Sequence, residues 1–377
     1  MCSSDLAAAD RIEAERRIVP DIVTALHEAG LFRMLLPVSL GGGAADILAF
    51  NQVIETIAAA DASTAWCLAQ QVASTQAASF LDPKVAHEIF AAPNGAVAWG
   101  PPAGAKAVVT DGGYIANGRW RFASGSEHCP WLGGHSAVIE ADGEPRLDAH
   151  GRPVMRTLLF RKEKATFHDI WHVLGLRGTA SNAYEVRELF VPEAYSTWRD
   201  NPADRRGDEP LCRIPLLTLY GMGFSGVALG IAQACLDAFK TLAATKKPSA
   251  MHGAPIPLRE HPMIQSRVAE ATGQLQSARA YLLDLLREFW DAATGKRAVS
   301  LEQRAQLRIA ITGAIEQACR VVDFAFRTAG ADAIFQGSPF ERRFRDMHTV
   351  TAQGQAHLSN FEGAGQALFG IETAQRL

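Results

Sequence analysis

The feature that most constrains the fold is a change of periodicity along the chain. Residues 7–90 have the apolar spacing of amphipathic helices, whereas residues 94–192 contain short apolar runs separated by Asp-Gly, His-Gly and Arg-Gly turns. After a polar linker at residues 199–210, helical spacing returns. Helices and strands therefore occupy separate regions, which argues against a parallel sheet of alternating strands and helices.

This order predicts an α+β chain, mainly α, in three parts. We expect an N-terminal helical domain at residues 1–93, a central antiparallel β-barrel at 94–198 and a C-terminal four-helix bundle at 199–377. A chain of 377 residues is long enough for two or three domains. The bundle helices are expected near residues 215–246, 262–294, 301–329 and 340–369.

The first region is expected to contain three helical segments. Residues 11–29 carry a helical pattern that Pro20 divides and Gly30 ends. Residues 47–60 and 62–80 form the other two segments. The last segment is nearly uncharged, so we expect it to be buried on most sides.

Charge and cysteine content narrow the class of protein. A formal net charge of -3 gives no electrostatic reason to expect nucleic acid. Six cysteines lie far apart without a CxxC pair, which argues against zinc ribbons and disulfide scaffolds and suits the cytoplasm. Residues 214–236 are uncharged and long enough to span a bilayer, but they contain Pro215, four glycines and Gln233. A buried core helix is therefore favoured, and no membrane is expected.

Two short motifs point to chemistry that their surroundings do not support. Residues 221–226 spell GxGxxG, but a long helix follows instead of the βαβ unit of a dinucleotide site, so close helix packing is expected. His168 and His172 have i,i+4 spacing in a region of expected strands, with no third ligand near them in the sequence. We therefore expect no metal site.

Residues 113–131, GYIANGRWRFASGSEHCPW, have the composition of a site for a flat ligand. Asn117-Gly118 predicts a two-residue hairpin turn. The small residues at 124–126 let a backbone approach a ring closely, and a flavin needs such an approach, a stacking surface and a hydrogen bond. An ordinary hairpin with core aromatics is the alternative. The candidate apolar walls within this stretch are Trp120, Phe122 and Trp131.

A second candidate lies at residues 174–186, LGLRGTASNAYEV. Its glycines expose backbone N–H groups, and Arg177, Thr179 and Ser181 add a charge and two hydroxyls. Such a loop can hold a phosphate or the polar edge of a flavin. A β turn with a surface arginine explains these residues equally well.

Four local sequences follow one another along the chain: STAWC at 63–67, NGRWRFASG at 117–125, GLRGTASNAYEVRELFVPEA at 175–194 and SPFERRFRDMHT at 338–349. Together they resemble the acyl-CoA dehydrogenase superfamily over nearly the whole chain. They look most similar to the two-component, reduced-flavin-dependent monooxygenases. The resemblance implies a helical domain, a β-barrel and a four-helix bundle, assembled as a homotetramer, with flavin between barrel and bundle.

The resemblance also separates two reactions. Many acyl-CoA dehydrogenases carry a catalytic glutamate after an Arg-Asp pair, whereas Arg345-Asp346 here precedes MHTVTAQGQAHLS, which has no carboxylate. A proton alpha to a thioester then has no obvious base. In the monooxygenases, the serine that matches Ser124 is expected to hydrogen-bond the flavin nitrogen that stays protonated while a C4a-hydroperoxide forms. A dry pocket protects that species.

The sequence departs from the monooxygenase pattern at two histidines. Ser74 or Thr75 stands near the first, and Gln353 stands near the second, with His348 and His357 on either side. On a helix, Gln353 and His357 would share a face opposite His348. Without this histidine pair, oxygenation of a substrate that needs no deprotonation, such as an indole-like ring or a sulfur atom, remains open.

The resemblance thus implies the oxygenase component of a flavin-dependent monooxygenase. It would take reduced FMN or FAD from a separate flavin reductase and use O2 to oxygenate a small apolar or aromatic compound. An FAD-dependent acyl-CoA dehydrogenase and a non-catalytic scaffold are the alternatives. The expected cofactor-binding residues are Trp99, Trp120, Ser124, Gly125, Arg177, Thr179 and Ser181. The expected catalytic residues are Ser124, His348, Gln353 and His357.

Overall fold

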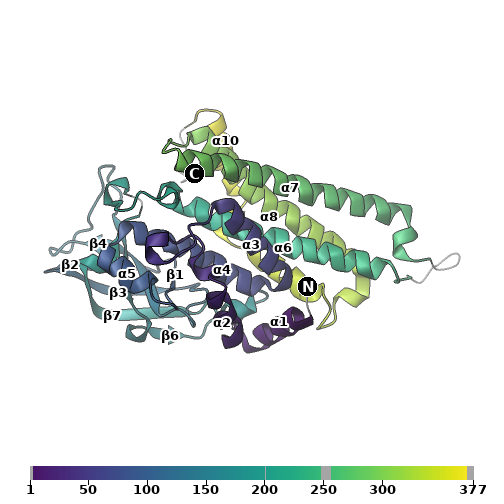
Figure 1. Cartoon of the computed structure of the whole chain (residues 1–377), viewed down its shortest axis with the longest axis horizontal. Helices are drawn as coiled ribbons and strands as arrows, with labels where there is room; N and C mark the ends of the chain where they lie inside the picture. The colour runs from purple at the N-terminus through teal and green to yellow at the C-terminus, as the bar shows by residue number, and fades with distance from the viewer. Residues whose placement is uncertain (1–2, 200, 248–255, 372–377) are drawn as a thin grey trace.

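The computed structural model describes residues 3–199, 201–247 and 256–371. In Figure 1 the strands gather at one end of an elongated molecule, and long helices run to the other end. Helices α3 (Ile47–Ala60) and α4 (Ala62–Ser74) lie between the two. The predicted class, α+β and mainly α, is confirmed.

The N-terminal helices begin and end where the local sequence signals it. Pro20 starts the second helix, as predicted, and Gly30 ends that region in the left-handed conformation with φ of 70°. The carboxylates of Asp46 and Asp61 cap α3 and α4 by accepting from backbone N–H groups. The segment expected to end at residue 80 leaves the α-helix after Ser74 and continues as a 3-10 helix. The remaining helices here are α1 (Ser3–Glu15), α2 (Pro20–Glu28) and α5 (Pro83–Phe90).

The strands form one mixed sheet in the order β6-β7-β3-β2-β4-β5-β8. Strand β4 pairs in parallel with β1 along its first half and with β2 along its second half, while the other ladders are antiparallel. The strands are β1 (Val97–Gly100), β2 (Lys106–Thr110), β3 (Gly113–Trp120), β4 (Trp131–Ile139), β5 (Met155–Arg161), β6 (Thr166–His168), β7 (Ala183–Pro192) and β8 (Ser196–Thr197).

The expected antiparallel barrel is wrong in two respects. Its ladders are not all antiparallel, because β1 and β2 both run along β4 in the same direction. The barrel is also not closed, because the strands at the two ends of the order, β6 and β8, are only three and two residues long and do not pair with each other in the described structure. The domain boundaries at residues 93 and 198 stay a prediction.

The hairpin turn expected at Asn117-Gly118 is also wrong. Strand β3 runs unbroken through both residues, and the turn from β2 lies earlier, at Gly112, whose φ is 73°. Asn117 instead marks a register shift against β7, where its side-chain oxygen accepts from the backbone N–H of Glu188 at 2.9 Å. A β-bulge therefore uses the residues that a local pattern assigns to a turn.

Helix α6 (Leu216–Ala243) is the apolar centre of the C-terminal bundle. Among the described residues it is the one helix long and apolar enough to cross a membrane, yet 94% of its most apolar window lies buried inside the protein. Glycines permit this packing, since a Cβ at Gly230 would lie 2.2 Å from the backbone oxygen of Glu55 on α3. Helices α7 (Pro262–Thr294) and α8 (Leu301–Ala329) lie alongside as predicted (Figure 1).

The fourth bundle helix, expected at residues 340–369, is interrupted. It consists of α9 (Glu341–Val350) and α10 (Ser359–Leu368), with a short 3-10 turn at Gly354–Ala356 between them. Gln353 leaves the helix with ψ of 163°, and its side-chain oxygen accepts from the backbone N–H of Gln355 at 2.7 Å. This break changes which side chains of the segment reach the interior.

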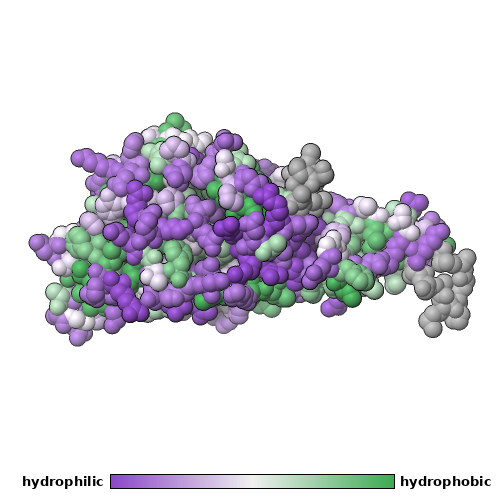
Figure 2. All heavy atoms as spheres, turned by 90° about the horizontal axis from the view of Figure 1, so that it is seen from below, coloured by the Kyte–Doolittle hydropathy of each residue, from purple (hydrophilic) through white to green (hydrophobic). Residues whose placement is uncertain are grey.

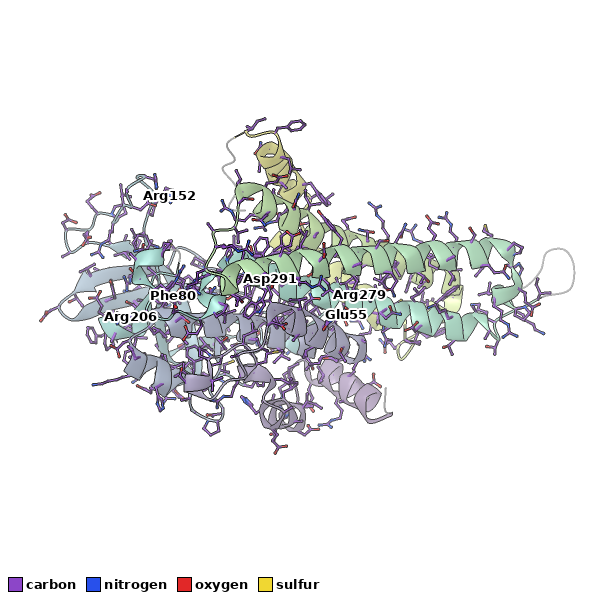
Figure 3. The ribbon with its side chains drawn as sticks, turned by 45° about the horizontal axis from the view of Figure 1, so that its top comes forward. Glu55, Phe80, Arg152, Arg206, Arg279 and Asp291 are labelled. Carbon is purple, nitrogen blue, oxygen red and sulfur yellow. The ribbon has the colours of Figure 1, made fainter. Side chains whose placement is uncertain are left out.

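Several ion pairs join the N-terminal helices to the bundle, among them the pair between α3 and α7. Arg279 on α7 donates through Nε to a carboxylate oxygen of Glu55 on α3 at 2.9 Å, and the two side chains point toward each other in Figure 3. Both side chains are largely buried, which strengthens such a pair relative to a surface pair. The outer surface in Figure 2 is mostly polar, with apolar residues gathered at the end that holds the sheet.

Candidate functional site

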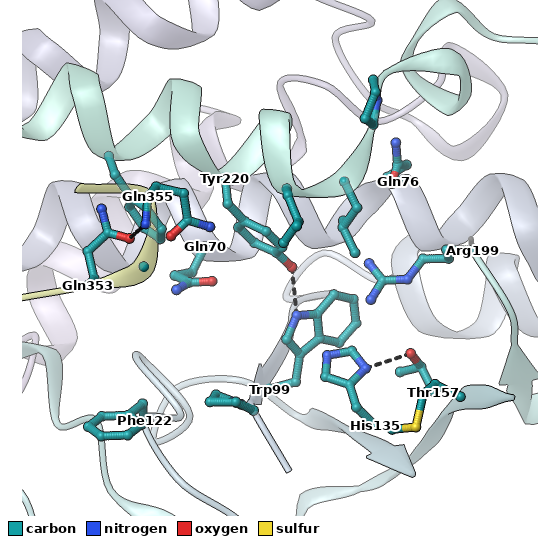
Figure 4. A pocket seen from close by; sticks show the side chains of 18 of the residues that line it. Gln70, Gln76, Trp99, Phe122, His135, Thr157, Arg199, Tyr220, Gln353 and Gln355 are labelled. Carbon is teal, nitrogen blue, oxygen red and sulfur yellow. Dashed lines mark hydrogen bonds between the residues drawn. The ribbon is translucent and has the colours of Figure 1, made fainter. Parts of the chain in front are cut away.

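A cavity of about 1350 Å³ lies where α4, the sheet, α6 and the break after α9 meet. Figure 4 shows amide side chains of Gln70, Gln353 and Gln355 on one side and Trp99, His135 and Arg199 on the other. A site for one small molecule measures roughly 300–1,000 Å³, so this cavity has room for a planar cofactor ring and a second compound.

A chain of hydroxyl groups ends at the cavity wall. Trp66 Nε1 donates to Ser124 Oγ at 3.1 Å, and Ser124 Oγ lies 2.7 Å from Ser181 Oγ. Ser181 Oγ lies 2.6 Å from Thr179 Oγ1, which donates its one proton to the backbone oxygen of Leu176 at 2.9 Å. Because each hydroxyl has one proton, Ser181 must donate to Thr179 and Ser124 to Ser181.

The direction of this chain fixes what Ser124 can offer. Its proton is used on Ser181, and one lone pair accepts from Trp66, so a second lone pair is left to accept from a ligand. Ser124 and Ser181 both line the cavity. The sequence therefore identified two residues that the structure brings together, with Thr179 buried behind them.

Gly125 and Arg177 hold the surrounding loops rather than lining the cavity. Gly125 has φ of 70°, and its N–H donates to the backbone oxygen of Thr179 at 2.8 Å. A Cβ at this position would lie 2.1 Å from the side-chain nitrogen of Gln71, so glycine is required. Arg177 extends to Glu13 on α1, with 3.4 Å between nitrogen and oxygen.

The aromatic walls differ from those expected. Trp99 and Phe122 line the cavity, and Trp171, which the sequence analysis missed, meets Phe122 edge-on with 6.1 Å between ring centroids. Trp120 is not a wall. It is fully buried in the sheet core, where Nε1 donates to the backbone oxygen of His135 at 2.9 Å and the ring stacks on Tyr184. Trp131 likewise packs away from the cavity.

The break after α9 separates three of the four expected catalytic residues, namely His348, Gln353 and His357. Gln353 lines the cavity, and its side-chain nitrogen is buried without a hydrogen-bond partner. His348 lies 2.9 Å from a carboxylate oxygen of Asp323 and packs on Phe344, while exposed His357 bonds Ser359. The shared helical face expected for Gln353 and His357 is therefore wrong, because neither residue lies in an α-helix.

No metal site was expected, yet one group of three possible ligands occurs in the described structure. Cys319, Asp323 and His348 have ligand atoms within 4.8 Å of one another, outside the cavity wall. The i,i+4 pair singled out in the sequence does not converge. His168 lies 3.2 Å from Glu185, and His172 lies 3.4 Å from Asp169.

His135 and Tyr220 are cavity residues that the sequence analysis missed. Tyr220 accepts a hydrogen bond from Trp99 Nε1 at 2.6 Å, and His135 Nδ1 lies 2.7 Å from Thr157 Oγ1. Burial, and then the nearby positive charge of Arg199, lower the pKa of His135 to about 3, so it is neutral at pH 7. No motif marks these residues, because they meet only through the fold.

The cavity has features that a reduced flavin ring requires. Ser124 offers an acceptor, Gln353 offers an unpaired donor, and Phe122 and Trp171 supply apolar surface. An orphaned buried amide costs free energy unless a ligand pairs with it. The residues that line the cavity therefore fit a reduced flavin.

Comparison with known proteins defines the class. Sequence models of the acyl-CoA dehydrogenase N-terminal and C-terminal domains match residues 2–82 and 222–357, and the chain belongs to the acyl-CoA dehydrogenase superfamily. It is 29% identical to the indole-3-acetate monooxygenase of Pseudomonas putida, over 97% of this chain and 91% of that protein.

Two further proteins share nearly the whole length. The flavin-dependent monooxygenase oxygenase subunit HsaA of Rhodococcus jostii is 29% identical, over 96% of this chain and 93% of that protein. Among solved structures, XiaF from Streptomyces sp. in complex with FADH2 and glycerol has a TM-score of 0.90 at 22% identity, covering 99% of this chain and 93% of that chain. The fold is therefore shared across this group.

Proposed function

We propose that this chain is the oxygenase component of a two-component flavin-dependent monooxygenase. It uses reduced FMN or FAD and O2 to oxygenate a small apolar or aromatic compound. The relatives named above support this function over nearly the full chain. The single observation that carries it is the directed hydroxyl chain from Trp66 to Leu176, which leaves Ser124 as an acceptor at the cavity wall.

Reduced flavin, when bound, supplies the two electrons that activate O2. Ser124 would hold a proton on the ring nitrogen by accepting its N–H, because the proton of Ser124 is donated to Ser181. Gln353 lines the cavity, and its Nε2, which has no partner in the described structure, would donate to an oxygen atom bound beside it. Phe122 and Trp171 would supply apolar surface against the ring.

The same wall disfavours the acyl-CoA dehydrogenase alternative. None of the described residues that line the cavity is an aspartate or a glutamate. Abstraction of a proton alpha to a thioester needs such a base within hydrogen-bond reach. His135 does not replace it, since a pKa of about 3 makes it a weak base.

The proposed function implies a flavin reductase as a partner protein. An oxygenase subunit receives its reduced flavin from a separate reductase, and the substrate and O2 complete the reaction. A homotetramer in the cytoplasm, without membrane attachment, is part of the proposal. The wide spacing of the cysteines supports a reducing compartment, and the five described cysteines are free thiols. Light scattering of the purified chain tests the assembly.

The function is tested with chemically reduced FMN or FAD, 18O2 and a panel of indoles, phenols and aromatic thioethers. We expect one 18O atom in a product, and Ser124→Ala should release roughly tenfold more hydrogen peroxide per product, as loss of one hydrogen bond predicts. Ser126→Ala is the matched control, since Ser126 Oγ is buried without a partner in the same loop. Complete conversion to peroxide with every compound contradicts the proposal, and anaerobic oxidation of an acyl-CoA thioester supports the dehydrogenase.

A further inference from the structure

The charged residues that line the cavity are all positive. Six arginines contribute to the wall, and none of the described lining residues is an aspartate, a glutamate or a lysine. Arg199 lies on the opposite side from Gln353 in Figure 4, and we call the part of the cavity beside Arg199 the cationic end. The six are Arg152, Arg156, Arg199, Arg205, Arg213 and Arg304.

Three of these arginines lack a carboxylate partner within the described ranges. Arg199, Arg205 and Arg304 form no ion pair there, whereas each of the other three pairs with an aspartate. Each of the three also has one buried guanidinium nitrogen without a hydrogen-bond partner, Nη1 in Arg199 and Nε in the other two. A buried donor on a charged group is costly unless a ligand pairs with it.

Arg199 is held in a geometry that suits hydrogen bonding to an anionic ligand. Its guanidinium carbon lies 4.3 Å from the centroid of the Trp99 ring, and that indole is fixed by the hydrogen bond from Nε1 to Tyr220. A guanidinium that stacks through its face keeps the N–H groups at its edge free to donate. Figure 4 shows this group directed into the space beside Trp99 and His135.

The neighbouring groups at this end carry no compensating negative charge. Tyr220 keeps its proton, because burial raises the pKa of its hydroxyl, and its oxygen accepts a hydrogen bond from Trp99. His135 is neutral for the reason given above. These two groups are therefore neutral, and the aspartates that pair with Arg152, Arg156 and Arg213 are not among the described lining residues.

We propose that the substrate is an aromatic carboxylate, whose carboxylate binds at the cationic end beside Arg199 while its ring lies toward Ser124. The inference rests on the proposed function and adds the substrate class. A carboxylate accepts two parallel N–H groups from one guanidinium, which fixes both position and orientation. The orientation selects the ring atom that meets the activated oxygen, so Arg199 determines regiochemistry as well as affinity.

The phosphate of the flavin is the other anion that could occupy this end. The substrate carboxylate and the flavin phosphate can be distinguished by asking whether substrate binding or FMN binding depends on Arg199. If Arg199 pairs with substrate, its removal weakens carboxylate binding and leaves the affinity for reduced FMN unchanged. If it pairs with the cofactor, its removal weakens FMN but not riboflavin, which lacks the phosphate.

The experiment titrates the flavin-free chain with matched pairs of aromatic acids and primary amides, indole-3-acetate with indole-3-acetamide and phenylacetate with phenylacetamide, and follows tryptophan fluorescence. We expect an acid of at least one pair to bind roughly tenfold or more tightly than its amide, as a charge-assisted bond predicts. In Arg199→Gln this preference should fall to about twofold. The control is Arg287→Gln, an exposed position on α7.

Three outcomes overturn the inference: equal binding of acids and amides, binding of neither series, or an Arg199→Gln effect on FMN that riboflavin does not share. Because these titrations need no turnover, a negative result in them can be distinguished from a negative result in the 18O2 assay. An active enzyme without acid preference keeps the proposed function and removes only the substrate class. Circular dichroism and thermal unfolding of each variant show that it is folded.

Discussion

Trp66 Nε1 donates a hydrogen bond to Ser124 Oγ at 3.1 Å, across 58 positions of sequence. The indole belongs to α4, and the hydroxyl belongs to the loop that follows β3. Because the indole nitrogen is only a donor, it can never compete for the proton of Ser124. The pair therefore sets the direction of the whole hydroxyl chain.

Thr179→Val should reverse that direction without touching the cavity. Valine keeps the shape of threonine but removes the acceptor of Ser181, so Ser181 donates to Ser124 and the proton of Ser124 turns toward the ligand. We expect roughly tenfold more peroxide per product, with similar affinity for reduced flavin. Thr328→Val, which removes a hydroxyl bonded within its own helix, is the control. Unchanged coupling in Thr179→Val would show that the chain has no directional role.

Gln353, rather than either neighbouring histidine, is expected to affect catalysis. Gln353→Leu removes the unpaired amide at the cavity and should lower product yield roughly tenfold. His348→Gln and His357→Gln should stay within about twofold, since one histidine pairs with Asp323 and the other is exposed. Steady-state product formation compares the three variants. A large loss of activity in His357→Gln with normal folding would contradict this arrangement.

Much of the fold follows from local signals. The starts of α3, α4 and α8 were predictable because Asp46, Asp61 and Ser300 are caps whose side chains accept from the first turn. The β-bulge at Asn117 was not predictable, because its hydrogen-bond partner Glu188 is on another strand. A two-residue pattern carries no information about such a partner, and the open ends of the sheet are equally non-local.

The candidate site divides in the same way. Ser124 and Ser181 were recognisable because small polar residues cluster near them in the sequence. The sequence analysis placed Arg199 in a polar linker, where an arginine is normally solvated. Its place in the candidate site became visible only through its contact with Trp99 in the structure. Trp120 failed as a cofactor wall for the opposite reason, since strand alternation turned its ring into the sheet core.

Asp346 should make stability depend on pH. It is buried and accepts from the backbone N–H of Leu176 at 2.6 Å, and burial raises its pKa from 3.8 to about 7. The folded chain then keeps a proton that the unfolded chain releases, so this contribution is full below about pH 4 and is lost as pH rises through about 7. Between pH 5 and pH 8, wild type should lose about 3 kcal/mol more than Asp346→Asn.

Urea unfolding at the two pH values measures this difference. Asp284→Asn is the control, because its side chain is 68% exposed on α7 and should leave the slope unchanged. Parallel pH profiles for wild type and Asp346→Asn would mean that Asp346 is ionised in the folded chain.

Two helical glycines should respond oppositely to alanine. At Gly230 a Cβ would meet the backbone oxygen of Glu55 at 2.2 Å, so α3 and α6 must separate, at a cost of about 1–3 kcal/mol. At Gly273 on α7 nothing lies within 4 Å, and alanine should stabilise the chain by about 0.5–1 kcal/mol through a less flexible unfolded state. Urea unfolding of both variants decides this, and equal effects would exclude close packing as the reason for Gly230.

The cavity wall is assembled from α4, the loop after β3, α6 and the break after α9. No contiguous piece of the chain contains all of them. A chimera that exchanges only one piece with a relative therefore has a cavity wall whose segments come from two proteins and do not fit each other. Transplanting substrate preference between such enzymes therefore calls for simultaneous grafting of distant segments, with α6 retained as their common support.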